Sequence, residues 1–188
     1  LDDHVRQIIA QHFDPERGTP YWLAFAERAG FSPLEEIQGF GDLELFGHFD
    51  EEALRREPHA AWIPGRLRGE PFSVFETGGT TGIPKSRLSW RDHKDDYTAY
   101  SDLLDDESFP RGAGWLMLGP TGPRRLRLSI EHLAQQRGGH CYFVDLDPRW
   151  VKLELSRGKH RVAGRYMEHI VDQAAAVLAH REVRCLFA

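Results

Sequence analysis

Cysteine is scarce in this sequence, and the two cysteines form no recognisable motif. Cys141 and Cys185 are the only ones in 188 residues, and each lies in an apolar, strand-like stretch. Two isolated cysteines cannot build a disulfide framework, and neither belongs to a CxxC pair of the kind that binds zinc. Because free cysteine is among the most often buried residue types, we expect both to be buried, reduced thiols.

Long apolar runs and an excess of basic residues are also missing. No stretch approaches the roughly 20 apolar residues that a membrane-spanning helix needs. The amino terminus, residues 1–4, has neither the basic start nor the apolar run of a signal peptide, so we expect a cytoplasmic protein. The net charge of −5 argues against a nucleic-acid partner held by a basic surface, although a phosphate site needs only a local positive field.

The composition that remains is that of a globular protein of the α/β class. Hydrophobic residues make up 40% and charged residues 28% of the chain, whose length is enough to bury one core. Residues 1–70 have the pattern of short helices joined by turns, an N-terminal helical segment. Residues 71–188 are typical of an α/β nucleotide-binding subdomain. We therefore expect a helical segment followed by a mixed, partly parallel β-sheet flanked by helices.

The helical segment carries recognisable start and stop signals. A first helical face near the amino terminus comprises Val5, Ile8, Ile9 and His12. Pro20 is suited to open a second helix at its first position, and Gly30 is suited to end it. Further short helices are predicted around 42–47 and 50–57, with Asp50 as the cap of the second.

Strand patterns begin after residue 70. Alternating residues predict strands at 71–77 and 86–90, and Asp92 can cap a helix that runs to about residue 104. The apolar side of that helix would comprise Tyr97, Tyr100, Leu103 and Leu104. Apolar strands at 114–118 and 141–144 enclose a helix, which implies a parallel pair with a right-handed crossover.

The remaining residues continue the α/β pattern to the end of the sequence. Helices fit 149–156 and about 160–181, and residues 183–188 form a last apolar strand. The apolar stripe of the helix at about 160–181 comprises Val162, Tyr166, Ile170, Ala174, Val177 and Leu178. A continuous apolar strand normally lies inside a covered parallel sheet, so we expect a truncation at Ala188, with a natural edge strand as the alternative.

One loop stands out for its chemistry. It comprises Thr77, Gly78, Gly79, Thr80, Thr81, Gly82, Ile83, Pro84 and Lys85. Three glycines let the backbone adopt left-handed conformations and turn successive amides toward an anion. The threonine hydroxyls add donors of adjustable direction, and Lys85 adds a positive charge directly after the rigid Pro84. These residue types in one loop indicate a polyphosphate site.

The loop differs from a Walker A loop in its sequence and in its flanks. A Walker A loop has glycine directly before the lysine and a helix after it. Here Pro84 precedes Lys85, and the residues from Ser86 onward have a strand pattern. The loop therefore joins two strands and offers no helix N-terminus to a phosphate, which separates it from kinases and GTPases.

Residues 77–85 resemble the phosphate-loop signature of the acyl-adenylate-forming (AMP-binding) superfamily. Phe75-Glu76 and the double glycine are most similar to its phenylacetate–CoA ligase-like, aryl-acid-activating branch. The Trp22 region and residues 42–47 resemble that branch more loosely. Many members have glycine after the lysine, where this chain has Ser86, so the loop class is clearer than the subfamily.

The resemblance implies an AMP-forming acid–thiol ligase. In that family the loop holds the β- and γ-phosphates of ATP while a carboxylate, here an aromatic acid, attacks the α-phosphorus. It implies Lys85 and Thr80 as catalytic residues, and Thr77, Gly78, Gly79, Thr80, Thr81, Gly82 and Lys85 as nucleotide-binding residues. ATP and Mg²⁺ are the implied cofactors, and CoA is an acceptor that the resemblance allows. The protein itself would supply no metal site.

Three further family elements have no match in the sequence, and this limits the expected activity. They are the aromatic-Gly-x-Thr-Glu segment, the ribose-binding aspartate and the lysine of a C-terminal domain. The resemblance therefore covers the N-terminal part of such an enzyme, and we expect this fragment alone to be inactive. The alternatives are a non-catalytic fragment that binds a nucleotide or a partner, and a phosphotransferase with an unrelated glycine-rich loop.

Other residue clusters have ordinary structural interpretations beside chemical ones. His132, His140 and Cys141 are close in sequence but lack metal-site spacing. Asp145 and Asp147 end a strand, and a helix cap is a simpler role for them than acid–base chemistry.

Two neighbouring segments could face a ligand. Residues 119–123 follow a strand and either line a pocket or form a plain turn. The basic residues Arg124, Arg125 and Arg127 are more simply the solvated start of a helix than an anion site.

Overall fold

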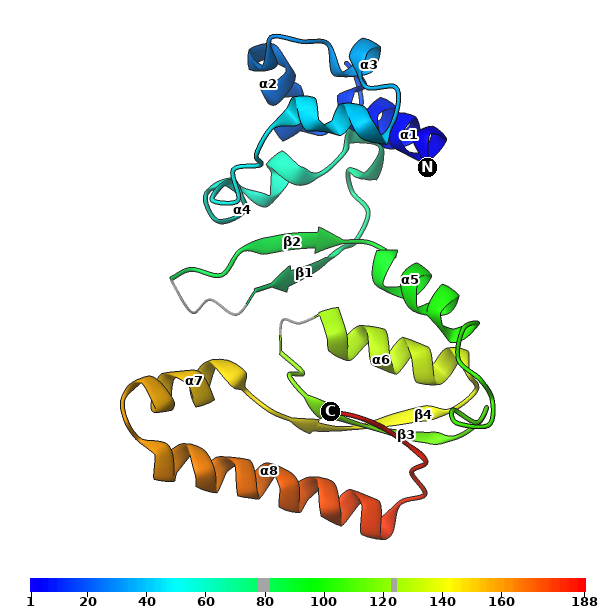
Figure 1. The fold of residues 1–188 in the computed structure, drawn as a ribbon, viewed down its shortest axis with the longest axis vertical. Coiled ribbons are helices and arrows are strands. Elements are labelled where there is room, and N and C mark those ends of the chain that lie inside the picture. The colour runs from blue at the N-terminus through cyan, green and yellow to red at the C-terminus, as the bar shows by residue number, and fades with distance from the viewer. Residues whose placement is uncertain (78–81, 123–124) are drawn as a thin grey trace. The chain divides into compact units, whose positions relative to one another are not determined.

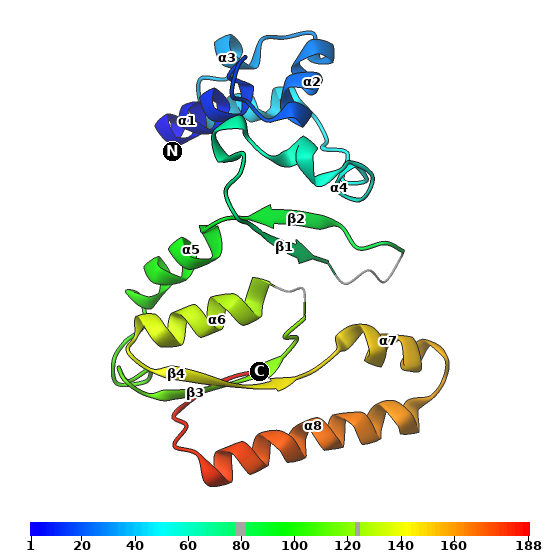
Figure 2. The same ribbon diagram turned by 180° about the vertical axis from the view of Figure 1, so that it is seen from behind.

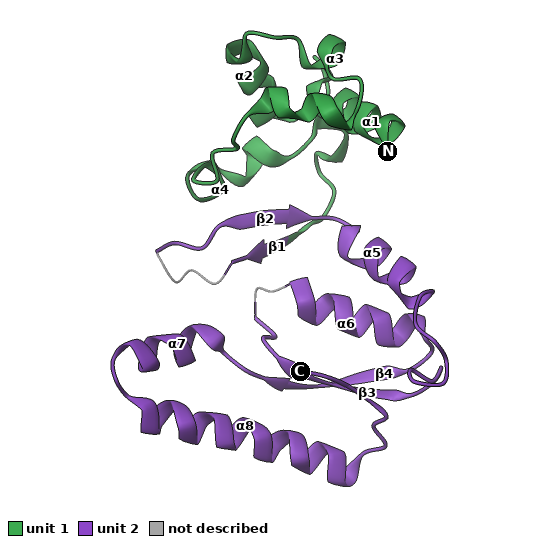
Figure 3. Cartoon of the chain, in the orientation of Figure 1, with its two compact units in different colours: residues 1–73 green, residues 74–188 purple. Residues whose placement is uncertain are grey.

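A computed structural model describes residues 1–77, 82–122 and 125–188 of the chain (Figure 1). The chain divides into two compact units, residues 1–73 and 74–188 (Figure 3). The first unit is helical, and the second contains strands and helices. The expected α/β class with an N-terminal helical segment is confirmed. No helix within the described ranges is both long and apolar enough to cross a lipid bilayer.

The first unit packs short helices around one aromatic-rich core. Its elements are α1 (Asp2–Phe13), α2 (Pro20–Ala29), α3 (Pro33–Glu36), η1 (Phe40–Phe46), α4 (Ala53–Arg56), η2 (His59–Trp62) and η3 (Gly65–Leu67). Val5, Ile9 and Phe13 are buried at a spacing of four residues, which places them on one face of α1. Trp22, Phe25 and Phe46 pack against them.

Local signals in this unit predicted the helix ends better than the buried face. Pro20 opens α2 at its first turn, and Gly30 ends it in the left-handed conformation, with φ 75°; both predictions are confirmed. The predicted face of α1 was wrong at Ile8, which is 40% exposed because the buried stripe passes through Ile9 and Phe13. Asp50 accepts a hydrogen bond from the Glu52 amide (3.0 Å), ahead of α4.

The second unit contains two separate sheets in the described residues. Its elements are β1 (Ser73–Glu76, which begins at the unit boundary), β2 (Ser86–Ser89), α5 (Asp92–Ser101), β3 (Gly114–Gly119), α6 (Arg125–Gln136), β4 (His140–Asp145), α7 (Pro148–Ser156), α8 (His160–His180) and β5 (Cys185–Phe187). β1 and β2 form a two-stranded antiparallel hairpin. The other three strands form a parallel sheet in the order β4-β3-β5.

Helices cover both faces of the parallel sheet (Figures 1 and 2). Trp115 and Met117 of β3 pack against α6, whereas Leu116, between them in sequence, packs with Ile170 of α8 on the opposite face. Alternate residues of a strand point to opposite faces, so a fully apolar β3 serves two cores. The predicted strand–helix–strand crossover is confirmed: Gly114 pairs with His140 in parallel.

Three predictions of burial need correction. α5 ends at Ser101 rather than near residue 104, so Tyr100 (49%) and Leu103 (80%) are exposed instead of facing a core. Leu178 of α8 is 46% exposed. β5 lies at one end of the described strand order, with β3 as its neighbour and Leu186 59% exposed, and the expected truncation at Ala188 stays a prediction.

The cysteines are free thiols that differ in their burial. Cys185 is buried as predicted, whereas Cys141 is only half-buried. Burial raises the pKa of Cys141 to about 11, so its thiolate is scarce at neutral pH.

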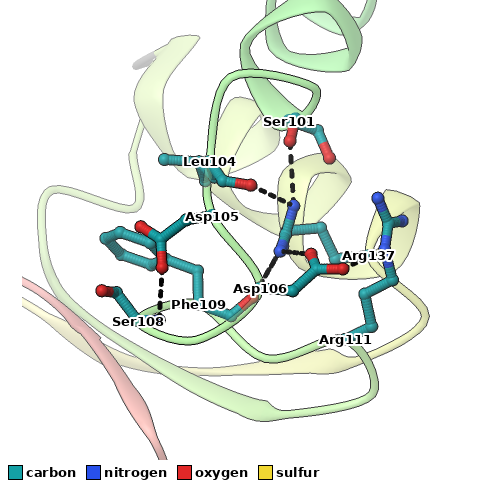
Figure 4. Close-up of polar contacts among 8 residues, drawn as sticks. All are labelled: Ser101, Leu104, Asp105, Asp106, Ser108, Phe109, Arg111 and Arg137. Atoms are coloured by element: carbon teal, nitrogen blue, oxygen red, sulfur yellow. Dashed lines mark hydrogen bonds and ion pairs between the residues drawn. The ribbon is translucent and has the colours of Figure 1, made fainter.

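A buried arginine organises the loop between α5 and β3 (Figure 4). The side chain of Arg137, directly after α6, has 0% exposure. Its guanidinium donates to the carbonyl oxygens of Ser101 (2.9 Å), Leu104 (3.5 Å) and Phe109 (3.1 Å from Nε), and to Asp106 Oδ1 (2.5 Å). The Asp106 side chain is 60% exposed, so water screens this ion pair. Inside the protein, the three carbonyl oxygens take the place of water as hydrogen-bond partners of the guanidinium.

Replacing Arg137 should destabilise the second unit strongly. Arg137→Met keeps an apolar stem but removes a charged donor from three carbonyl oxygens, which should lower the free energy of unfolding by about 3 kcal/mol. Chemical denaturation measures this loss. The matched control is Arg111→Ala, because Arg111 binds the same Asp106 (3.2 Å) but is 57% exposed and should matter little. Equal losses in the two variants would contradict the assignment.

The same cluster predicts an acid-sensitive contribution to stability. The hydrogen bond from Arg137 holds the pKa of Asp106 below its usual value. A lowered folded-state pKa stabilises the protein above the unfolded-state pKa, and this contribution is lost as the pH falls through the folded-state value. The difference in unfolding free energy between the wild type and Asp106→Asn should therefore be constant near neutral pH and shrink below about pH 4. A difference that does not change down to pH 3 would contradict this.

Candidate functional site

The predicted phosphate loop lies between the two strands of the hairpin. β1 ends at Glu76 and β2 begins at Ser86, so the prediction of a loop that joins two strands is confirmed. Two hydrogen bonds close the stem of the loop. The Thr77 amide donates to the Lys85 carbonyl oxygen (3.0 Å), and the Lys85 amide donates to Thr77 Oγ1 (3.1 Å). The first and last residues of the motif are thus held together.

The described residues of the loop differ in their exposure and backbone conformation. Thr77 and Gly82 are exposed, and Lys85 is half-buried. Gly82 has φ 136°, a conformation that residues with a side chain rarely adopt, so the predicted need for glycine is met here. The remaining predicted site residues, Gly78, Gly79, Thr80 and Thr81, lie outside the described residues.

An arginine that the sequence analysis missed attaches the loop stem to the rest of the unit. Arg149, in the first turn of α7, donates from Nη2 to Glu76 Oε2 (3.1 Å) and to the Thr77 carbonyl oxygen (3.0 Å). These partners are more than 70 residues away in sequence, so no local pattern could indicate the contact. The only signal in the sequence was that Arg149 lies at the start of a helix that follows an apolar strand.

This attachment places the loop stem beside the first turn of α7, which follows the carboxyl end of β4. α7 follows β4 after two residues, Leu146 and Asp147, so Arg149 lies close to the carboxyl end of β4. In open parallel sheets, ligands bind outside the carboxyl ends, at the point where successive connections diverge to opposite faces. The order β4-β3-β5, with α6 and α8 on opposite faces, puts that point beside β3.

Two hydrogen bonds join the end of β3 and the loop after it to the end of β4. The Thr121 amide donates to Asp145 Oδ1 (2.9 Å), and the Leu146 amide donates to the Gly119 carbonyl oxygen (3.1 Å). Asp147 caps α7 by accepting from the Arg149 (2.9 Å) and Trp150 (3.3 Å) amides, as the sequence predicted. Both carboxylates therefore have structural partners, which leaves no acid–base pair here.

The far end of the hairpin is held by a buried polar cluster. Ser89 ends β2, donates to the Asp92 carboxylate of α5, and lies 3.2 Å from His93 Nδ1. Burial lowers the pKa of His93, so the ring is neutral at pH 7, and it packs edge-on against Phe75 of β1 (5.7 Å). A serine beside a histidine can form a nucleophilic pair, but Ser89 is only 2% exposed, so no substrate reaches it.

The other basic and metal-binding candidates also have structural partners. Arg125 pairs with Asp96 and Asp92, and Arg127 pairs with Glu131 (3.2 Å), so an anion would compete with carboxylates for both. Arg124 lies outside the described residues. His132 Nε2 lies 2.8 Å from Thr98 Oγ1. Across residues 1–77, 82–122 and 125–188, no group of three or more His, Cys, Asp or Glu could hold a metal ion.

An apolar cavity in the same unit is separate from this edge. Its volume is about 500 Å³, and its lining includes Tyr97, Trp115, Leu133 and Phe187. Trp115 is the second residue of β3, and Leu133 lies in the last turn of α6. The cavity therefore faces the amino end and the middle of the sheet, and we do not include it in the candidate site.

Comparisons with known proteins assign the chain to no family. No family model matches the chain, and no curated protein matches it.

Proposed function

We propose that this chain is the N-terminal part of an AMP-forming ligase, which activates a carboxylic acid with ATP to an acyl-adenylate. The observation that carries the proposal is a Gly/Thr/Lys loop between two strands, whose stem is bound by Arg149 close to the carboxyl end of β4. Residue types suited to a polyphosphate thus lie where α/β sheets bind ligands. An unrelated phosphotransferase loop would call for a helix after Lys85, but β2 follows instead.

The described residues have donors suited to the phosphates of ATP. Thr77 Oγ1 already accepts a hydrogen bond from the Lys85 amide, so its hydroxyl proton can point to a phosphate oxygen. Lys85, whose backbone pairs with Thr77, contributes a positively charged side chain at the exit of the loop. No metal-binding cluster lies among the described residues, so Mg²⁺ would bind through the phosphates of the nucleotide.

In the proposed reaction the carboxylate oxygen of the acid attacks the α-phosphorus. The P–O bond to the β-phosphate breaks, giving acyl-AMP and pyrophosphate. Catalysis of this kind rests on positioning and charge neutralisation, which is the contribution proposed for this loop. The acid is proposed to be aromatic from the resemblance alone. The rest of the reaction needs residues that this sequence does not contain, so the chain by itself binds the nucleotide without completing the chemistry.

Removing the lysine tests the phosphate role directly. Lys85→Ala should weaken Mg·ATP binding to this chain by about tenfold or more, because each charge-assisted contact contributes roughly 1.5–3 kcal/mol. Isothermal titration calorimetry with Mg·ATP and with Mg·pyrophosphate measures the change. Lys94→Ala, an exposed lysine of α5, is the control and should bind as the wild type does.

The outcomes separate the proposed ligase from simpler nucleotide binding. Wild-type binding that Lys85→Ala leaves unchanged would remove the loop from its role. If the loop does bind, the decisive assay is acid-dependent exchange of labelled pyrophosphate into ATP by the polypeptide extended to include the missing family elements. Binding without any exchange would favour a non-catalytic nucleotide-binding protein.

The glycine requirement gives a second test. Gly82→Ala adds a methyl group that meets no atom of the described residues within 4 Å, so the effect expected here comes from the φ of 136°. Holding alanine in this region costs about 1–3 kcal/mol, which should appear as weaker Mg·pyrophosphate binding or lower hairpin stability. Gly41→Ala, also in open space but without a positive φ, is the control. Wild-type behaviour of Gly82→Ala in both measurements would contradict a fixed loop conformation.

A further inference from the structure

Arg149 contacts the loop stem at two chemically different groups. One guanidinium nitrogen donates to the carboxylate of Glu76, the last residue of β1, and to the main-chain carbonyl of Thr77, the first residue of the loop. We propose that Arg149 is a positioning residue that fixes the stem of the phosphate loop beside the first turn of α7, close to the carboxyl end of β4. This inference rests on the proposed function, because it assumes that the loop binds phosphates.

Thr77 is the point at which this contact acts. Its amide and its hydroxyl oxygen both bind Lys85, and its carbonyl oxygen accepts from Arg149. All three polar groups of one residue are therefore engaged in holding the stem. The bonds to Lys85 hold the two ends of the stem together, whereas the bond from Arg149 attaches the stem to α7.

The anchor itself is held from several directions. Asp147 accepts from the amides of Arg149 and Trp150, which fixes the first turn of α7. The Asp147 amide donates to Tyr166 Oη of α8 (3.0 Å), and the rings of Trp150 and Tyr166 pack edge to face at 4.9 Å. The backbone of Arg149 is therefore tied to both β4 and α8, so its side chain can act as a fixed support.

Stability alone is a poor explanation for this contact. The side chains of Arg149 and Glu76 are 35% and 31% exposed, and ion pairs with such access to water stabilise a fold only slightly.

A second alternative to positioning is that Arg149 only neutralises charge. The Glu76 carboxylate lies beside the loop and would repel a polyphosphate, and Arg149 would only have to mask it. The carbonyl contact to Thr77 favours positioning over masking, because masking requires no bond to the backbone.

A double-mutant experiment separates these roles. Mg·pyrophosphate affinity is measured by calorimetry for the full chain and for Arg149→Ala, Glu76→Gln and the double variant. Positioning predicts that Arg149→Ala weakens binding about tenfold, the scale of one lost charge-assisted bond, and that adding Glu76→Gln does not restore it. Arg157→Ala is the matched control, because Arg157 ends the same helix and pairs with Glu154 (3.0 Å).

A second measurement needs no ligand. Amide hydrogen exchange of Thr77 should become faster in Arg149→Ala, whereas exchange in β3 and the midpoint of thermal unfolding should stay unchanged. Arg149→Lys, which restores a donor of the same charge, should recover part of both the affinity and the protection.

Each outcome has one meaning. Full recovery of affinity in the double variant would overturn positioning in favour of masking. Unchanged affinity and unchanged Thr77 exchange in Arg149→Ala, with Lys85→Ala still impaired, would overturn this inference and leave the proposed function intact. No binding of Mg·pyrophosphate by the wild type would overturn the proposed function, and the inference with it.

Discussion

The second unit depends on the solvation of one buried charge. Arg137 has no exposed side-chain surface, so its guanidinium must find acceptors inside the protein. Main-chain carbonyls at Ser101, Leu104 and Phe109 provide most of them, and this requirement shapes the connection between α5 and β3. The end of α5 is thereby joined to the end of α6. Because α5 also carries Asp92, the same constraint extends to the hairpin.

The hairpin is attached to the unit at both of its strands. β2 is held through Ser89 and its contacts with Asp92 and His93 at the start of α5. β1 is held at its end by Arg149 of α7. A two-stranded hairpin of four-residue strands has few contacts of its own, and these polar attachments determine where its ends are held. They also relate the loop stem to the parallel sheet, which no contact within the hairpin could do.

The sequence predicted local events well and long-range geometry poorly. Pro20, Gly30 and Asp147 act within a few residues of themselves, and their roles as helix start, stop and cap were readable. The apolar runs of β3 and β4 also predicted a parallel pair. In contrast, Ile8 and Leu103 were assigned to buried faces because periodicity cannot tell which residue of a stripe meets a partner. The support from Arg149 joins residues more than 70 positions apart, and a hydrogen bond at that distance leaves no periodic signal.

The partners of the acidic residues around the loop stem explain how the proposed polyphosphate site is compatible with a net charge of −5. Glu76 is paired with Arg149, Asp145 accepts from the Thr121 amide, and Asp147 accepts from the first amides of α7. A carboxylate bound to a guanidinium or to amides has part of its field cancelled locally, so it repels an approaching anion less than a free one. The global charge therefore says little about this edge. What matters is that each carboxylate there has a donor, and that the donor to Glu76 is the same group that holds Thr77 in place.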